Sequence, residues 1–280
     1  MSAGPARHFL FTVDADWVPG SDRGLEALLA LCEERRLRAT IFTTGRFSAA
    51  YRALIAAAHG AGHEIGVHGW EHPMPTFGAE NYRFTPVARR HDWLLRATEA
   101  VAEATGRRPR AFRAPYLWTD AATFALLERL GYAIDSSVPT RRFDGLLGMV
   151  NHVEFLLAPL DPYHPDPRRP GRRGASPILE VPPSAFVLPM NMSTLRFAGL
   201  GWALRLAGLI GRRAATLNFY CHPWEFVEPE RLRFPPGTPS RHTHGLGPRW
   251  LATLRAFLDA TLARGYASST TAEVAACGSW

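Results

Sequence analysis

The chain has 280 residues, of which 46% are hydrophobic and 20% charged, so it can bury a sizeable core and is not a disordered protein. Its formal net charge of +7 comes from arginine alone, because the sequence contains no lysine. The arginines are dispersed and not interleaved with aromatic residues, which argues against a nucleic-acid partner. The one dense arginine cluster, 168–173, lies among prolines and predicts a solvated loop.

The cysteines and the N-terminal sequence bear on the cellular compartment. Cys32, Cys221 and Cys277 are far apart and form no CxxC pair, which argues against a disulfide framework or a thiolate zinc site and favours a reducing compartment. The N-terminus lacks the apolar region of a signal peptide, and no apolar run has the length of a transmembrane helix. We therefore predict a cytoplasmic protein.

Short apolar runs alternate with amphipathic stretches through the first half of the chain. Ser21 or Asp22 is a plausible cap for the first helix, and Asp120 caps a later one. Glycines close the helices, as at Gly106 and Gly131. We predict strands at 8–14, 38–44, 63–68, 110–114 and 132–137, and helices at 22–36, 48–62, 85–106 and 120–131.

The second half resumes this alternation after a segment of different composition. Residues from about 138 to 177 are rich in Pro, Arg and Asp and predict an irregular insertion or lid. Strands are then predicted at 178–184, 215–221 and 266–270, with an apolar helix at 193–213 and a final helix at 248–265. The alternation predicts βαβ units with a parallel sheet in one domain, 1–280, and the number of units suits a barrel-like closure.

Polar residues follow the ends of four predicted strands. Active sites of parallel β/α folds are built at the carboxyl ends of the strands, so these side chains are expected on one rim. The residues are Asp14, Asp16, His68, His72, Arg113 and His222.

The two histidines have the spacing of a metal-binding pair. Zinc accepts imidazole nitrogen and carboxylate oxygen, and one Asp with two His supplies the three protein ligands of a catalytic site. Pro73 and Pro75 argue against a helix here, so His68 and His72 are expected at a strand end and in the following loop. The alternative is that both histidines are surface or capping residues.

The two aspartates sharpen the prediction of a metal. On an extended segment, residues i and i+2 point the same way, so Asp14 and Asp16 would face one site and need a cation between or beside them. If one binds the metal, the other can take a proton from the water that the metal activates. The alternative is a solvated Asp-x-Asp turn.

Four segments, in this order, resemble one known family. "TVDADW", "HGWEH", "FRAPY" and "FYCHPWEF" span 12–225 and are similar to the NodB-type polysaccharide deacetylases, carbohydrate esterases with a distorted (β/α) barrel fold. The adjacent Asp-Asp of most members is Asp-Ala-Asp here, as in the branch that contains some peptidoglycan deacetylases and lipid-linked aminoarabinose deformylases. The resemblance implies an α/β, distorted (β/α) barrel and hydrolysis of an N-acyl group.

The resemblance also implies a role for each of these residues. Asp14 would be the general base, paired with Arg113, and His222 the general acid. Asp16, His68 and His72 would bind a divalent metal, expected to be Zn²⁺, with Co²⁺ or Ni²⁺ as alternatives. The backbone N–H of Tyr116 would help to stabilise the oxyanion. Asp135 is the predicted partner that orients His222.

Substrate contacts are predicted from proximity to these groups. Trp17, Trp70, Trp118 and Trp224 lie within a few residues of them, and aromatic faces stack on sugar rings, although a tryptophan near a rim is also ordinary core. His242 and His244 lie in a loop rich in Gly and Pro. His244 could contact substrate, the two could form a second metal site, or the loop could be simply polar.

We predict a metal-dependent hydrolase that removes an N-acyl group, expected to be N-acetyl, from an amino sugar in a glycan or glycan precursor that can be lipid-linked. The alternatives are a deformylase or cyclic-amide hydrolase on the same site, and a degenerate glycan-binding protein. The apolar segment 193–213 is expected to be a core helix. Its alternative is peripheral membrane contact through Arg196, Arg205, Arg212 and Arg213.

Overall fold

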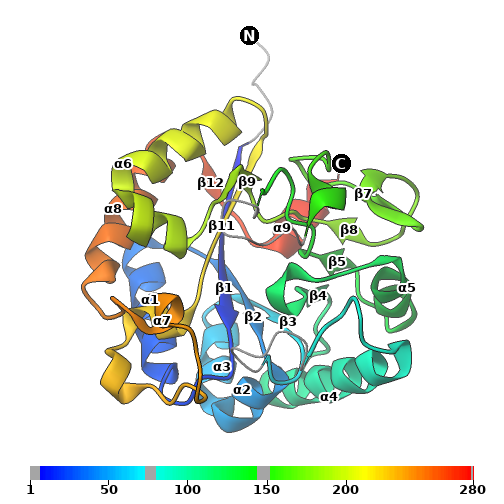
Figure 1. Cartoon of the computed structure of the whole chain (residues 1–280), viewed down its shortest axis with the longest axis horizontal. Coiled ribbons are helices and arrows are strands. Elements are labelled where there is room, and N and C mark those ends of the chain that lie inside the picture. Colours follow the sequence, from blue (N-terminus) through cyan, green and yellow to red (C-terminus); the bar gives the residue numbers. More distant parts are fainter. Residues whose placement is uncertain (1–6, 73–79, 144–151, 279) are drawn as a thin grey trace.

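The computed structural model describes residues 7–72, 80–143, 152–278 and 280, and its main feature is an eight-stranded parallel sheet curved into most of a barrel (Figure 1). The strand order is β11–β1–β2–β3–β4–β5–β8, and β12 pairs with the first residues of β1. The strands are β1 (His8–Ala15), β2 (Ala39–Thr43), β3 (Glu64–Val67), β4 (Ala111–Phe112), β5 (Ile134–Asp135), β8 (Leu179–Glu180), β11 (Thr216–Cys221) and β12 (Ala267–Ser268). The predicted distorted (β/α) barrel is confirmed.

Helices surround the sheet, as Figure 1 shows. Every predicted helix except 48–62 is present as one helix, with ends within a few residues of the predicted ends. They are α1 (Asp22–Arg35), α2 (Gly45–Ala50), α3 (Arg52–Gly60), α4 (Val87–Thr105), α5 (Ala121–Arg129), α6 (Met192–Gly211), α7 (Ser240–Thr243), α8 (Trp250–Leu262) and α9 (Thr271–Ala276).

Successive side chains of β1 point to opposite faces of the sheet and pack in two different clusters. Phe9, Phe11 and Val13 pack into the large core between strands and helices, whereas Leu10 belongs to a smaller cluster that also contains Val274 of α9. Because side chains of a strand alternate, Asp14 lies on the same side as Leu10 and not on the helix side. The first acid therefore projects from the same face as Leu10, at the carboxyl end of β1.

The barrel is not closed by a regular ladder between β8 and β11. Pro182 and Pro183 have no N–H to donate, so a continuous ladder cannot form there. Asn218 of β11 bridges the gap instead: its backbone O accepts from Ser184 N at 3.0 Å, and its Nδ2 donates to Val181 O at 3.2 Å and Pro182 O at 3.1 Å. One backbone bond and the Asn218 side chain thus replace a regular ladder at this point, and the barrel is distorted here.

The predicted helix 48–62 is two helices, α2 and α3, that meet at Tyr51. Tyr51 leaves the helical region with φ −117° and ψ 43°. Its ring packs on Phe47, with centroids 4.7 Å apart, and on Trp17 at 6.1 Å. Apolar periodicity continues across this break, which is why the sequence predicts one helix.

The segment 138–177 contains more regular structure than expected. Its described residues form a 3₁₀ turn (Val153–Phe155) and an antiparallel hairpin of β6 (Pro165–Asp166) and β7 (Arg169–Arg173). The cluster 168–173 is therefore mostly a strand and not a loop, although its arginines are largely exposed as predicted. A second hairpin, β9 (Ala185–Phe186) with β10 (Leu188–Pro189), was not predicted. The single-domain organisation stays a prediction.

The apolar segment 193–213 forms α6, which breaks at Gly199 (φ 82°). Seven of its residues are buried, including Leu195, Leu206 and Ile210, so its inner side is core as expected. Arg196, which the membrane alternative placed at headgroups, is turned inward to Glu225. Among the described residues, no helix is long and apolar enough to cross a membrane.

Candidate metal centre and active site

A buried ion pair lies at the carboxyl end of β1. Arg113, directly after β4, has no exposed surface, and its NH1 donates to Asp14 Oδ1 at 2.7 Å and to Thr12 Oγ1 at 2.9 Å. Its Nε and NH2 donate to the backbone O and the Oγ of Ser136, at 3.1 and 2.8 Å. Four hydrogen bonds fix the guanidinium, so Asp14 is oriented by a rigid partner.

The second acid leaves the strand. β1 ends at Ala15, and Asp16 N donates back to Asp14 O at 3.1 Å, so the chain turns there and the expected extended i, i+2 geometry does not hold. Both carboxylates are nevertheless buried, with 3% of Asp14 and 1% of Asp16 exposed. A tight turn, not strand alternation, brings Asp16 to the mouth of the barrel.

His68, at the end of β3, faces Asp16 as a neutral imidazole. Its Nδ1 lies 2.8 Å from the carbonyl O of Arg113, which can only accept, so Nδ1 carries the hydrogen. Burial lowers the pKa of His68 to about 4, although the charges of Asp14 and Asp16 oppose this shift. Nε2 therefore bears a lone pair, which lies 3.5 Å from Asp16 Oδ1.

These facing lone pairs fit a bound cation. Asp16 Oδ1 has no hydrogen-bond partner among the described residues, and His72 Nε2 lies 4.0 Å from it. One ligand atom each from Asp16, His68 and His72 lie within 4.8 Å of one another, and no other group of three such residues occurs in the described part of the chain. Zinc bonds to nitrogen and oxygen of about 2.0–2.2 Å can span the 3.5 and 4.0 Å that separate Asp16 Oδ1 from the Nε2 atoms of His68 and His72.

Asp16 is a carboxylate despite its burial. Burial raises the pKa of Asp16, but the neighbouring His72, His222 and His68 and the Trp224 N–H outweigh it and lower the pKa. The indole Nε1 of Trp224 donates to Asp16 Oδ2 at 3.1 Å. This bond occupies one oxygen and leaves Oδ1 facing the two histidines.

The loop that carries His72 is held by a residue that the sequence analysis missed. Glu80 is buried, and its carboxylate accepts from three consecutive backbone N–H groups, those of Trp70 (2.6 Å), Glu71 (2.7 Å) and His72 (2.8 Å). His72 has a φ of +46°, which is rare for a residue with a side chain. Glu80 thus holds the backbone of His72 in the conformation that turns its ring to Asp16.

His222 lies across from the histidine pair, just past β11. Its Nε2 is 4.0 Å from Asp16 Oδ2, and its Nδ1 contacts Glu225 Oε2 at 3.2 Å. Glu225 also accepts from the backbone N of His222 at 2.9 Å and from Arg196 NH1 at 3.1 Å. The partner of His222 is therefore Glu225 and not, as predicted, Asp135; the spacing of three residues in "HPWE" was the overlooked signal.

Asp135 has other partners. Its oxygens accept from Ser137 Oγ at 2.7 Å and Ser137 N at 3.1 Å, and it forms a buried carboxyl pair with Glu180. Burial raises the pKa of Glu180 well above its usual range, and the charge of Asp135 adds to the shift. Glu180 therefore keeps its proton beside the Asp135 carboxylate.

His222 is poised to carry a proton at neutral pH. Burial alone lowers the pKa of His222, but the hydrogen bond to Glu225 and the charges of Asp16, Glu225 and Asp14 outweigh it and raise the pKa to about 9. A cation bound at Asp16 would lower this pKa, because it offsets one of the nearby carboxylates.

The predicted substrate residues lie in different surroundings. Trp224 is buried and stacked on His222, with ring centroids 4.8 Å apart. It therefore packs behind the site, and its ring is not accessible to a sugar. Trp17, Trp70 and Trp118 are half-buried. His244 is exposed and takes part through its carbonyl, which accepts from Arg196.

Tyr116 lies beside the metal ligands. Its backbone φ is +57°, within the short 3₁₀ segment Pro115–Leu117, and its ring is 4.3 Å from that of His72. The centroid of the Trp118 ring lies 5.9 Å from that of the Tyr116 ring. The "FRAPY" motif thus places both the Arg113 guanidinium and Tyr116 at the same mouth of the barrel.

Comparison with known proteins agrees with this geometry. The family model for polysaccharide deacetylase matches residues 2–134. This part of the chain, a little under half of its length, is therefore similar to the polysaccharide deacetylase family. A peptidoglycan deacetylase of Helicobacter pylori (strain ATCC 700392 / 26695) is 30% identical over 115 residues, which are 41% of this chain and 37% of that protein. The family match includes Asp14 to Tyr116 but ends before His222 and Glu225.

Solved structures extend the likeness to the whole fold. A Mycobacterium smegmatis protein assigned to the polysaccharide deacetylases superposes with a TM-score of 0.61 at 19% identity, over 98% of this chain and 91% of that one. The Puue allantoinase superposes with a TM-score of 0.64 at 17% identity, over 98% and 93%. The shared barrel is therefore common to proteins with different named activities.

We expect Glu80→Gln to weaken binding of Zn²⁺ or Co²⁺ by roughly 10- to 100-fold, because the amide nitrogen would face backbone N–H groups and release the His72 loop. Calorimetric titration of the metal-free protein measures this directly. Glu71→Gln is the matched control, since Glu71 is in the same loop with a partly exposed side chain paired to Arg46. Equal affinities for the two variants would contradict the assigned role of Glu80.

We expect Glu180→Gln to gain stability relative to wild type as the pH rises. Folded Glu180 keeps its proton, whereas the unfolded chain releases it above the ordinary value of 4.5, so wild-type stability falls with pH. The slope is at most about 1.4 kcal/mol per pH unit for one proton. Denaturant unfolding of both proteins from about pH 5 to about pH 8 measures this slope. If the free energies of unfolding of the two proteins changed equally with pH, Glu180 would not keep its proton in the folded state.

Proposed function

We propose that this protein is a metal-dependent amide hydrolase that removes an N-acetyl group from an amino sugar of a glycan, with peptidoglycan as the first substrate to test. The observation that carries the proposal is the unpartnered Asp16 Oδ1, which faces the lone pair of His68 Nε2 and the ring of His72 inside the barrel mouth. A proton-accepting carboxylate and a protonated imidazole flank this centre on separate strands.

A divalent metal held by Asp16, His68 and His72 would polarise the amide carbonyl and make a bound water more acidic. Asp14 is the residue to accept the proton of the attacking water. Its Oδ1 is held by Arg113 at 2.7 Å, so Oδ2 is the oxygen proposed to accept the proton. Arg113 keeps this carboxylate oriented and offsets its charge, so Asp14 can be buried and still act as a base.

His222 supplies the proton for the leaving amine. Glu225 accepts from Nδ1, so the proton to be donated is on Nε2, the atom that points to Asp16 and the reaction centre. The bond to Glu225 keeps this ring oriented and charged, which is what a general acid requires. The backbone N–H of Tyr116 is the proposed second donor to the carbonyl oxygen, beside His72.

The similarity to polysaccharide deacetylases and the aromatic residues at the mouth support the proposed substrate class. The Helicobacter pylori relative is a peptidoglycan deacetylase, and the stretch that matches the polysaccharide deacetylase family model includes Asp14, His68 and His72. Trp118 offers a half-buried ring next to Tyr116, and Trp17 stacks between Tyr51 and Arg46. These rings are the proposed contacts for the sugar adjacent to the acetamido group.

We expect Asp14→Asn to lower kcat by roughly 10²- to 10⁴-fold while metal content stays at the wild-type level, because Asp14 acts as a base and not as a ligand. Acetate release from N-acetylated glycans, with elemental analysis of the same samples, tests both parts. A chelator should abolish the wild-type activity, and Zn²⁺ or Co²⁺ should restore it. N-formyl substrates assayed in parallel distinguish a deformylase. Full activity of Asp14→Asn would contradict the assignment of Asp14 as the base.

We expect Glu225→Gln to lower kcat by roughly 10- to 100-fold with little change in KM, because the neutral amide no longer holds His222 protonated. Asp135→Asn is the matched control, since Asp135 is a buried carboxylate of the same barrel that bonds to Ser137 and lies beside Glu180. Comparable losses in the two variants would show that Glu225 has no special part in the chemistry.

A further inference from the structure

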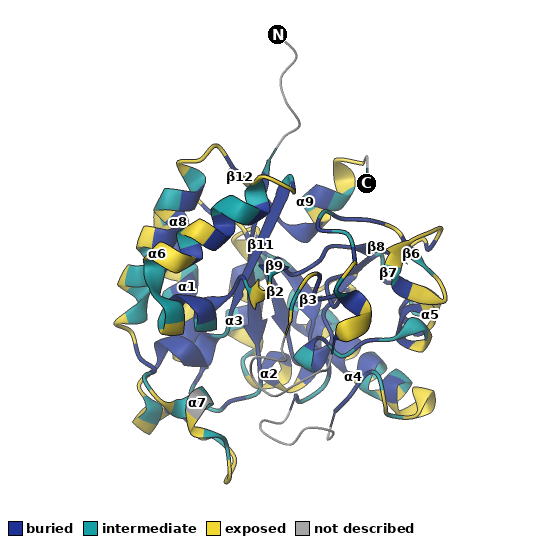
Figure 2. Ribbon diagram, turned by 45° about the horizontal axis from the view of Figure 1, so that its top comes forward, coloured by how far each residue is buried: buried dark blue, intermediate teal, exposed yellow. Residues whose placement is uncertain are grey.

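The outer side of α6 exposes large apolar side chains. Phe197 is 67% and Trp202 61% exposed, although buried residues of the same helix, such as Leu206, pack into the core. The β9–β10 hairpin, which packs against α6, adds Val187 and Leu188, both exposed. Figure 2 shows exposed residues along α6. Exposed aromatic residues in such a group mark a contact surface.

The segment that forms α6 and the β9–β10 hairpin carries charge of a single sign. Residues 181–224 contain no Asp or Glu, whereas four arginines occur there. Arg205 of α6 and Arg212, directly after the helix, are exposed, and Arg205 lies over the Trp202 ring at 5.4 Å. A helix with aromatic and leucine residues beside arginines, and without acids, is typical of a segment that lies in the interface of an anionic membrane.

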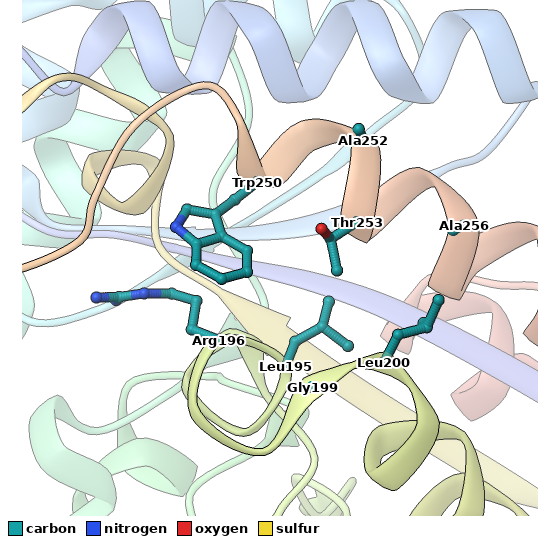
Figure 3. A pocket seen from close by; sticks show the side chains of 8 residues that line it. All are labelled: Leu195, Arg196, Gly199, Leu200, Trp250, Ala252, Thr253 and Ala256. Carbon is teal, nitrogen blue, oxygen red and sulfur yellow. The ribbon is translucent and has the colours of Figure 1, made fainter.

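A groove continues the apolar surface beside the helix. Where α6 breaks at Gly199, a groove of about 490 Å³ opens between α6 and α8. Leu195, Leu200 and Trp250 supply much of its lining, with Arg196 and Trp250 at one end, as Figure 3 shows. The apolar area available to an interfacial contact is therefore larger than the two exposed aromatic rings alone.

This surface lies close to the candidate active site. Asn191, which caps α6, forms a β-bridge with Tyr220, two residues before His222. Arg196, next to Phe197, binds Glu225, the residue that holds His222. A partner that covers Phe197 would thus be adjacent to the mouth of the barrel.

We propose that the α6 face, defined by Phe197, Trp202 and Arg205, docks this protein on an anionic lipid surface. The aromatic rings insert at the level of the headgroups, and the arginines meet the lipid phosphates. A second copy of the chain fits less well, because the two α6 faces would bring arginines together without acids to pair them. The docking itself does not depend on the proposed function. Only its consequence, that the enzyme would meet its substrate at a membrane, rests on that function.

Flotation with lipid vesicles tests the docking without any enzyme assay. Wild-type protein is expected to bind vesicles that contain phosphatidylglycerol, to bind phosphatidylcholine vesicles weakly, and to be released by salt. The double variant Phe197→Ser/Trp202→Ser should bind at least about tenfold more weakly. Arg205→Ala should lose about fivefold, the equivalent of one cation near the surface.

Phe84→Ser is the matched control, because Phe84 is 71% exposed but packs on Trp118 and not on α6. It should bind vesicles as wild type does. Light scattering of each variant reports the oligomeric state in parallel. Absence of binding by the wild type, binding that the double variant retains, or a wild-type dimer that the double variant abolishes would overturn the proposal. Loss of deacetylase activity towards free glycans would bear on the proposed function alone.

Discussion

The buried pair of Asp14 and Arg113 is the constraint on which the rest of the mouth depends. An isolated carboxylate at the end of a buried strand would be too costly, so a cation has to reach it from another strand. Arg113 does so with four hydrogen bonds, and its own backbone carbonyl fixes the tautomer of His68. One residue therefore orients both the proposed base and a proposed metal ligand.

Around this pair, each polar group that faces the centre is held by a second group. Glu80 fixes the backbone of His72, Trp224 occupies one oxygen of Asp16, and Glu225 orients His222. The one buried oxygen of this centre without a partner among the described residues is Asp16 Oδ1. These bonds hold Asp16, His222 and the backbone of His72 near the centre before any cation binds, which lowers the cost of ordering them.

The same helix connects the chemistry to the outer surface. Arg196 of α6 reaches inward to Glu225, while its neighbour Phe197 faces solvent. Both parts of α6, before and after the break at Gly199, pack on the core, through Leu195 and Leu206 respectively. A single segment thus carries both a support for the proposed acid and the proposed membrane contact.

The sequence by itself determined the order of strands and helices and the rim residues Asp14, Asp16, His68, His72, Arg113 and His222, because apolar periodicity and position after a strand are local properties. Only the tertiary structure decided which carboxylate meets which partner. Glu225, and not Asp135, contacts His222, and Glu80 reaches the His72 loop, since such pairings depend on side-chain placement across turns. Asp16 arrives at the site through a turn, not through strand alternation. The sequence also did not predict which side of α6 is exposed. An apolar helix carries no polar stripe that would mark the face left uncovered by the core.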